Sequence, residues 1–184
     1  MIKSSELILN PDGSVYHLNL KPENIANDII FVGDQERVSK ITQHFDSIEF
    51  STQKREFKTE TGMYKGKRLT VQSTGIGPDN IDIVLNELDA LVNVDLNTRE
   101  IKPNHTALNI VRIGTSGSLQ ADIPVDSWVM SKYAIGLDNM LRSYLIEEHS
   151  VAALEDAFIT QTNWDLRKGR PTVVPCDKTL EDKI

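Results

Sequence analysis

The chain has 184 residues, which is enough for one domain with a hydrophobic core but crowded for two. Its 39% hydrophobic and 26% charged residues are typical of a globular protein, and no apolar run approaches the roughly 20 residues that a membrane-spanning helix needs. The net charge of -7 excludes a broad electrostatic surface for nucleic acid or an anionic membrane, although a few converging arginines can still bind phosphate.

The chain shows no targeting segment and no sign of a domain boundary. The first residues include Glu6 and lack a continuous apolar stretch, so we expect no secretory signal and a cytoplasmic location. Cys176 is the single cysteine and has no internal disulfide partner, which fits a reducing compartment. Because no repeat or linker interrupts the sequence, we expect one domain over residues 1–184.

The first third of the chain alternates strand-like and helical patterns. Residues 28–32 form a short apolar run that ends in Gly33. Residues 35–45 place apolar side chains on one helical face, and Asp34 is a suitable N-cap for that helix. Three strand-like runs follow, which we expect to form a meander: residues 47–52, 57–64 and 68–73.

A glycine-rich turn at residues 75–77 interrupts this pattern and opens a second helix. The apolar stripe predicted for that helix consists of Ile81, Val84, Leu85, Leu88, Leu91 and Val92. Residues 107–113 predict a buried strand that is closed by the turn at residues 114–117. The later elements are less regular: strands at 127–130 and 133–137, a helix at 150–158, a loop at 163–169 and the start of a helix at 179–184.

This alternation indicates an α/β fold, a single domain with a mixed, mostly buried central sheet flanked by helices. In open α/β sheets, ligands gather beyond the carboxyl ends of the strands. Gly33, the turn at residues 75–77 and the turn at residues 114–117 each follow a predicted strand. We therefore expect a ligand site where these turns meet.

Gly33 and Arg37 are the first candidates for an anion site. A glycine lets the backbone approach an anion, the helix that follows offers free N–H groups, and Arg37 lies one turn further on. The alternative is an ordinary strand-to-helix turn with a surface arginine.

Arg112 and Thr115 are a second candidate anion site, at the end of the strand predicted at residues 107–113. An arginine at the end of a buried strand is costly unless it meets an anion, and Thr115 with its neighbouring N–H groups suits phosphate. The alternative is an internal salt bridge. Neither a dinucleotide fingerprint nor a Walker sequence is present.

Arg55 and Glu56 lie between two strand-like runs. By themselves, adjacent charges of this kind are most often a solvated surface pair with little energetic effect.

Four short motifs, in this order, resemble those of the nucleoside phosphorylases, the purine and uridine phosphorylase family, with the uridine phosphorylases nearest. The motifs are Phe-Val-Gly33-Asp34-Gln-Glu-Arg37-Val, Arg55-Glu56-Phe57, Ser73-Thr74-Gly75-Ile76-Gly77-Pro78 and Arg112-Ile113-Gly114-Thr115-Ser116-Gly117. The resemblance runs from about Tyr16 to Asp138. It implies a nucleoside phosphorylase-like fold and a pentosyltransferase that cleaves a nucleoside, uridine favoured, with phosphate as co-substrate and no organic cofactor.

The resemblance also implies roles for particular residues. The phosphate-binding residues would be Gly33, Arg37, Arg55, Arg112 and Thr115, with Arg55 reaching into the site of a neighbouring subunit. The nucleoside-binding residues would be His17, Thr115, Ser116 and Gly117, with His17 approaching the ribose 5'-hydroxyl in the neighbour. A monovalent cation such as potassium would bind at Glu56, Ile76 and Asn80. No catalytic acid or base is identified, because phosphate itself is the nucleophile.

The partners implied are a nucleoside, inorganic phosphate and further copies of the chain, as a dimer of the family type or a hexamer of dimers. The base-recognition Gln and Arg and the Glu-Met-Glu segment of the family are not found, so we expect the chain to be truncated at its C-terminus. Alternative functions are a nucleosidase that uses water, a non-catalytic phosphate- or nucleotide-binding module, and a structural domain with ion-paired arginines.

Overall fold

A computed structural model describes residues 1–183 of the chain. The chain divides into two compact units, Met1–Ser116 and Gly117–Ile184, and each is described by itself. No helix within residues 1–183 is long and apolar enough to cross a membrane.

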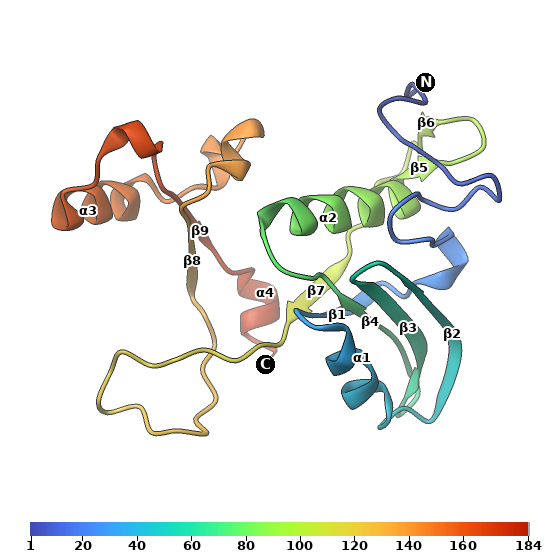
Figure 1. The fold of residues 1–184 in the computed structure, drawn as a ribbon, viewed down its shortest axis with the longest axis horizontal. Coiled ribbons are helices and arrows are strands. Elements are labelled where there is room, and N and C mark those ends of the chain that lie inside the picture. The colour runs from blue at the N-terminus through green and yellow to red at the C-terminus, as the bar shows by residue number, and fades with distance from the viewer. Residues whose placement is uncertain (184) are drawn as a thin grey trace. The chain divides into compact units, whose positions relative to one another are not determined.

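The first unit is built on a five-stranded mixed sheet (Figure 1). Its strands are β1 (Asp28–Val32), β2 (Ser47–Lys54), β3 (Phe57–Tyr64), β4 (Lys67–Ser73) and β7 (Asn109–Arg112). The strand order is β2-β3-β4-β1-β7, in which β1 is parallel to both β4 and β7 while β2, β3 and β4 form an antiparallel meander. The expected α/β fold with a mixed central sheet is therefore confirmed.

Helices cover both faces of this sheet because β1 is apolar on both sides. Ile29 and Phe31 pack in one cluster with α2 (Pro78–Asn93), whereas Val32 packs in the other with α1 (Gln35–Thr42). Successive strand residues point to opposite faces, so a continuous apolar run of this kind suits a strand between two helical layers. The short strands β5 (Val94–Asp95) and β6 (Glu100–Ile101) follow α2.

Three expectations for the first unit need correction. The helix predicted for residues 35–45 ends at Thr42. β7 is shorter than residues 107–113 and is not fully buried, because it is the last strand of the sheet within the described residues and exposes both end residues. Leu85, predicted in the apolar stripe of α2, is 41% exposed. The buried positions of that helix follow the spacing Val84, Glu87, Leu88 and Leu91.

The second unit contains a two-stranded antiparallel sheet and short helices. Its regular elements are β8 (Tyr133–Gly136), α3 (Ala152–Thr162), β9 (Thr172–Pro175) and α4 (Lys178–Glu181), with 3-10 turns at Met140–Ser143, Glu147–His149 and Leu166–Lys168. The strand predicted at residues 127–130 is wrong, since that segment is irregular and the Trp128 side chain is 96% exposed. The last residue of the helix predicted at 179–184 lies outside the described residues.

Candidate phosphate-binding site

The carboxyl ends of three parallel strands meet at one edge of the sheet. β4, β1 and β7 are neighbours, and the turns after them are tied by backbone hydrogen bonds. Gly75 N donates to Gly33 O at 3.0 Å, and Ile113 N donates to Phe31 O at 2.9 Å. The three glycine turns predicted from the sequence thus begin side by side at the carboxyl end of the sheet.

The guanidinium of Arg112 lies against two glycines of this edge. A Cβ added at Gly33 would be 3.7 Å from Nη2 of Arg112, and one added at Gly114 would be only 3.1 Å from Nη1. Glycine at these positions therefore leaves room for the arginine beside the backbone. A larger side chain at Gly114 would push the guanidinium aside.

Arg37 approaches the same edge from α1. Asp34 caps this helix as expected, accepting a hydrogen bond from Glu36 N at 2.6 Å. Nη2 of Arg37, one turn into the helix, lies 3.5 Å from Oγ1 of Thr115, a long hydrogen bond between residues 78 positions apart. The structure thus brings together Gly33, Arg37, Arg112 and Thr115.

These arginines have no acidic partner. Within residues 1–183, neither Arg37 nor Arg112 forms an ion pair, although Arg68 in the same unit pairs with Glu49 at 2.7 Å. Arg112 is also exposed, so the expectation of a costly buried arginine is wrong. Since the internal salt bridge is absent from the described residues, the two cations can serve an anion from outside the chain.

Arg55 lies at the same end of the sheet, in the turn between β2 and β3. Its φ of 56° is left-handed, and Ser73 Oγ at the end of β4 donates to Glu56 O at 2.6 Å, which fixes the turn beside β4. The Arg55 side chain is exposed and forms no hydrogen bond or ion pair in residues 1–183. It is therefore not joined to Arg37, Arg112 or Thr115.

Glu56, Ile76 and Asn80 converge, but not as three oxygen ligands. Asn80 Nδ2 donates to Glu56 Oε1 at 2.9 Å and to Ile76 O at 3.1 Å. Gly75, between them, has a φ of 70° and would place an added Cβ 2.7 Å from both side chains. Because both neighbours are acceptors, the amide must present its N–H₂ group, which cannot coordinate a cation. As arranged in this chain, the set does not fit a monovalent cation.

His17 lies in the N-terminal segment and is held by a residue that the sequence reasoning missed. Its Nδ1 is 2.7 Å from Glu87 Oε1, and its backbone N–H also donates to that carboxylate. The helical spacing that selects Val84, Leu88 and Leu91 also selects Glu87, so a charged residue in a buried stripe was the available signal.

Besides His17 and Thr115, two predicted nucleoside contacts lie where the units divide. Ser116 ends the first unit and Gly117 begins the second, and both are exposed. Their role in lining a nucleoside pocket stays a prediction.

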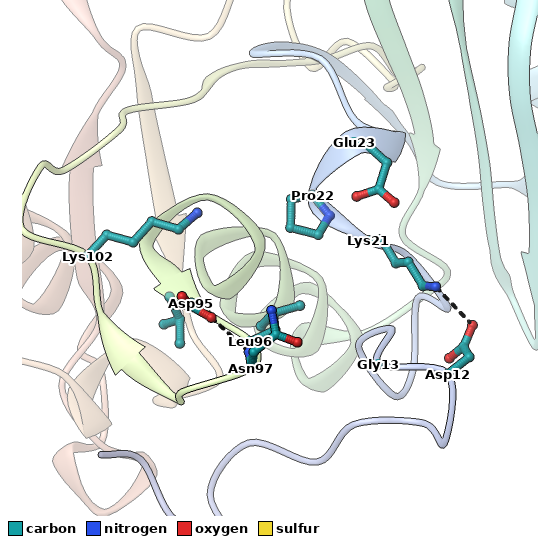
Figure 2. Close-up of a pocket in the computed structure, with 10 residues that line it drawn as sticks. Asp12, Gly13, Lys21, Pro22, Glu23, Asp95, Leu96, Asn97 and Lys102 are labelled. Atoms are coloured by element: carbon teal, nitrogen blue, oxygen red, sulfur yellow. Dashed lines mark hydrogen bonds and ion pairs between the residues drawn. The ribbon is translucent and has the colours of Figure 1, made fainter.

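A separate pocket of about 360 Å³ lies in the first unit, lined partly by the turn after α2 (Figure 2). Its charged groups serve local structure: Lys102 Nζ donates to Val92 O at 3.0 Å, and Asp95 accepts from Asn97 N at 2.9 Å. None of the predicted site residues lines it. The pocket is therefore not the candidate site.

Comparison with known proteins places the chain in a family. The sequence model of the Phosphorylase superfamily matches residues 28–184. A uridine phosphorylase of Thermococcus kodakarensis is 32% identical over 153 residues, which cover 83% of this chain and 50% of that protein. A DeoD-type purine nucleoside phosphorylase of a Thermoanaerobacter species is 34% identical over 116 residues, covering 62% of this chain and 44% of that protein.

A solved structure agrees with these relatives. The fold is similar to that of a Trypanosoma brucei nucleoside phosphorylase with uridine phosphorylase activity, with a TM-score of 0.83, 34% identity and coverage of 96% of this chain and 59% of that one. The chain spans about half the length of the curated relatives it matches. The resemblance inferred from four short motifs is confirmed, and the chain belongs to the Phosphorylase superfamily, among the nucleoside phosphorylases.

Proposed function

We propose that this chain supplies the phosphate-binding part of a nucleoside phosphorylase that converts a nucleoside, uridine favoured, and inorganic phosphate into the free base and ribose 1-phosphate. The preference for uridine rests on the relatives from Thermococcus kodakarensis and Trypanosoma brucei. The phosphate would bind at Gly33, Arg37, Arg112 and Thr115.

One observation carries the proposal: two arginines without acidic partners converge on glycine turns at the carboxyl ends of parallel strands. Most arginines within residues 1–183 are already bonded to carboxylates or carbonyls. Among those that are not, Arg37 and Arg112 lie at the glycine turns, whereas Arg55 is not joined to them. Planar guanidinium groups match the oxygens of phosphate, and backbone N–H groups beside a glycine add further donors.

The chemistry needs few protein groups. A phosphate oxygen donates an electron pair to C1' of the ribose, and the bond from C1' to the base nitrogen breaks. The electron pair of that bond leaves with the base, which gains the proton that the hydrogen phosphate gives up. Arg37 and Arg112 would hold the nucleophile in place and balance its charge, while the sugar passes through an oxocarbenium-like state. Neither arginine has to transfer a proton.

Arg55 and His17 would act across a subunit boundary. Arg55 is unbonded within residues 1–183, and His17 is exposed over about a quarter of its side chain, so both are open to a second copy of the chain. We therefore include a homo-oligomer in the proposal, with Arg55 serving the phosphate of the neighbour and His17 its ribose. The monovalent cation is not included, because Asn80 already satisfies the oxygens of Glu56 and Ile76.

Phosphate binding measured by calorimetry tests the proposal. Arg112→Ala should weaken binding at least tenfold, since a hydrogen-bonded charge contributes about 1.5–3 kcal/mol. Arg167→Ala is the matched control, because it removes the same charge from a surface pair with Asp165. Equal binding by both variants would overturn the phosphate site.

Product analysis separates the proposal from its alternatives. Incubation with uridine and phosphate should release uracil and ribose 1-phosphate. Release of free ribose without any need for phosphate would indicate a nucleosidase. Phosphate binding without any turnover by the full-length protein would indicate a non-catalytic binding module.

A further inference from the structure

Glu87 is a carboxylate on the buried face of α2. It lies one helical turn from Val84 and Leu91, which belong to the main hydrophobic cluster, and it is only 8% exposed. A charge in such surroundings is costly unless hydrogen bonds compensate for the lost water. Its partners therefore define its role.

Within residues 1–183, the hydrogen-bond partners of the Glu87 carboxylate come from one short segment near the N-terminus. His17 N donates to Oε1 at 2.9 Å and to Oε2 at 3.0 Å, and Leu18 N donates to Oε2 at 2.8 Å. The imidazole adds a fourth contact, from Nδ1 of His17 to Oε1 at 2.7 Å. A single side chain thus ties the segment to α2 across about 70 positions of sequence.

These contacts determine which ring nitrogen of His17 carries the proton. An ionised carboxylate only accepts hydrogen bonds, so Nδ1 must donate, and the neutral ring then has its lone pair on Nε2. No hydrogen bond engages Nε2 within residues 1–183, and 26% of the side chain is exposed. The nitrogen left to meet a ligand is therefore an acceptor.

A second contact holds the same segment from the other side. Lys54 Nζ donates to Tyr16 O and lies 4.3 Å from the centre of the Tyr16 ring. Lys54 is the last residue of β2 and directly precedes Arg55, so the segment that carries His17 is bonded to the strand that leads into the turn with Arg55. The Tyr16 ring in turn packs edge-on against the ring of His17, with the ring centres 4.9 Å apart.

We propose that Glu87 is a positioning residue that holds His17 as the Nδ1–H tautomer, so that Nε2 accepts a hydrogen bond from a hydroxyl of the ribose bound by a neighbouring copy of the chain. The ribose part of this inference rests on the proposed function. The tautomer part does not, because it follows from the contacts of Glu87 alone.

Nitrogen NMR of the full chain with labelled histidine tests the tautomer directly. At about pH 8.5, where imidazoles are neutral, His17 should show a protonated Nδ1 and an unprotonated Nε2. Glu87→Gln should shift the population toward the Nε2–H form, whereas Asp89→Asn, which removes an exposed carboxylate from the same helix, should not. An Nε2–H tautomer in the wild-type protein would overturn the proposal, whether or not the Gln variant folds.

Ligand binding tests the ribose contact with uridine and 5'-deoxyuridine as probes. The wild-type protein should prefer uridine by roughly 2- to 10-fold, the usual effect of one hydrogen bond, and Glu87→Gln should lose most of that preference while the affinity for 5'-deoxyuridine stays the same. An unchanged preference would overturn the positioning role. If the wild-type protein binds neither nucleoside, the proposed function fails, and the NMR result still decides the tautomer.

Discussion

The two units of the chain use their arginines differently. In residues 117–183 every arginine is paired with a carboxylate: Arg142, Arg167 and Arg170. In the first unit three arginines have neither an ion pair nor a hydrogen bond to a backbone carbonyl within the described residues: Arg37, Arg55 and Arg112. The paired arginines compensate acidic groups of the protein itself, whereas the unpaired ones lie at one end of the central sheet. An arginine without an internal partner is thus a better guide to a ligand site than an arginine as such.

Glu155 is the clearest example of an acidic group compensated by arginines. Its nearly buried carboxylate pairs with both Arg142 and Arg170. Its side chain is 2% exposed and accepts from Arg142 at 3.0 Å, Arg170 at 2.7 Å and Val173 N at 3.2 Å. Loss of the Glu155 charge would leave two partly buried guanidinium groups without their counter-charge.

The largest expected effect is therefore on folding of the second unit. Glu155→Gln should lower the free energy of unfolding by about 3 kcal/mol, near the low end for buried pairs because Arg170 is partly exposed. Both tryptophans, Trp128 and Trp164, lie in this unit, so denaturant unfolding can be followed by their fluorescence. Asp165→Asn, in an exposed pair, should have a much smaller effect. Similar losses in the two variants would remove the distinction between buried and exposed pairs.

The second prediction concerns the first unit, where loss of an arginine without an ion pair should affect ligand binding rather than stability. Arg37→Gln should weaken phosphate binding roughly tenfold, about 1.4 kcal/mol, with little change in unfolding, because no ion pair is lost and the one hydrogen bond to Thr115 is long and exposed. Arg68→Gln should do the opposite, since Arg68 bonds Glu49 and the Ile25 carbonyl. Calorimetry and denaturant unfolding of both variants would measure the two effects. Equal loss of stability in both would show that Arg37 is structural.

Acid should destabilise the second unit through Glu155. Burial alone would raise the pKa of Glu155, but hydrogen bonds from Arg170 and Val173 N, together with the charge of Arg142, hold it below its usual value of 4.5. A carboxyl with a lowered pKa contributes stability that is present above pH 4.5 and is lost as the pH falls through the folded-state pKa. Unfolding of the second unit measured from neutral to acid pH should show this loss. Glu155→Gln should flatten that part of the profile, and an unchanged profile would assign the acid sensitivity to other groups.

The smallest expected effect concerns the Glu56 carboxylate and the Ile76 carbonyl, which both accept hydrogen bonds from Asn80. Since the Asn80 amide already satisfies Glu56 and Ile76, the melting temperature of the first unit should be the same in potassium chloride and choline chloride. Asn80→Ala should cost about 1 kcal/mol, the usual effect of lost hydrogen bonds, whereas Asn97→Ala in an exposed loop should not. Stabilisation of the wild-type protein by potassium would favour a cation in place of the amide contact.

Sequence patterns predicted the parts of the fold that local physics decides. The apolar run at residues 28–32, the cap at Asp34 and the glycine turns each follow from neighbouring residues, and parallel pairing then brings the turns together. The resemblance supplied the grouping of Arg37 with Thr115, which spacing alone left open.

What the sequence did not predict depends on contacts between distant residues. Glu87 is tolerated in a buried stripe only because the backbone of His17 and Leu18 reaches it, and no local pattern contains that information. The direction of the Asn80 amide is likewise set by Glu56. Ser127–Met130 has strand-like residues but no strand beside it in residues 1–183, so propensity without a partner gave a wrong prediction.

The position of β7 gives Arg112 a second effect. β7 reads Asn-Ile-Val-Arg and is followed by Ile113, and within residues 1–183 only β1 pairs with it. A charge on an outer strand acts as a gatekeeper against edge-to-edge aggregation. Arg112→Ala removes the one charge of this strand, so that variant should become less soluble as its concentration rises. Its phosphate affinity is therefore best measured in dilute protein, with light scattering as a check.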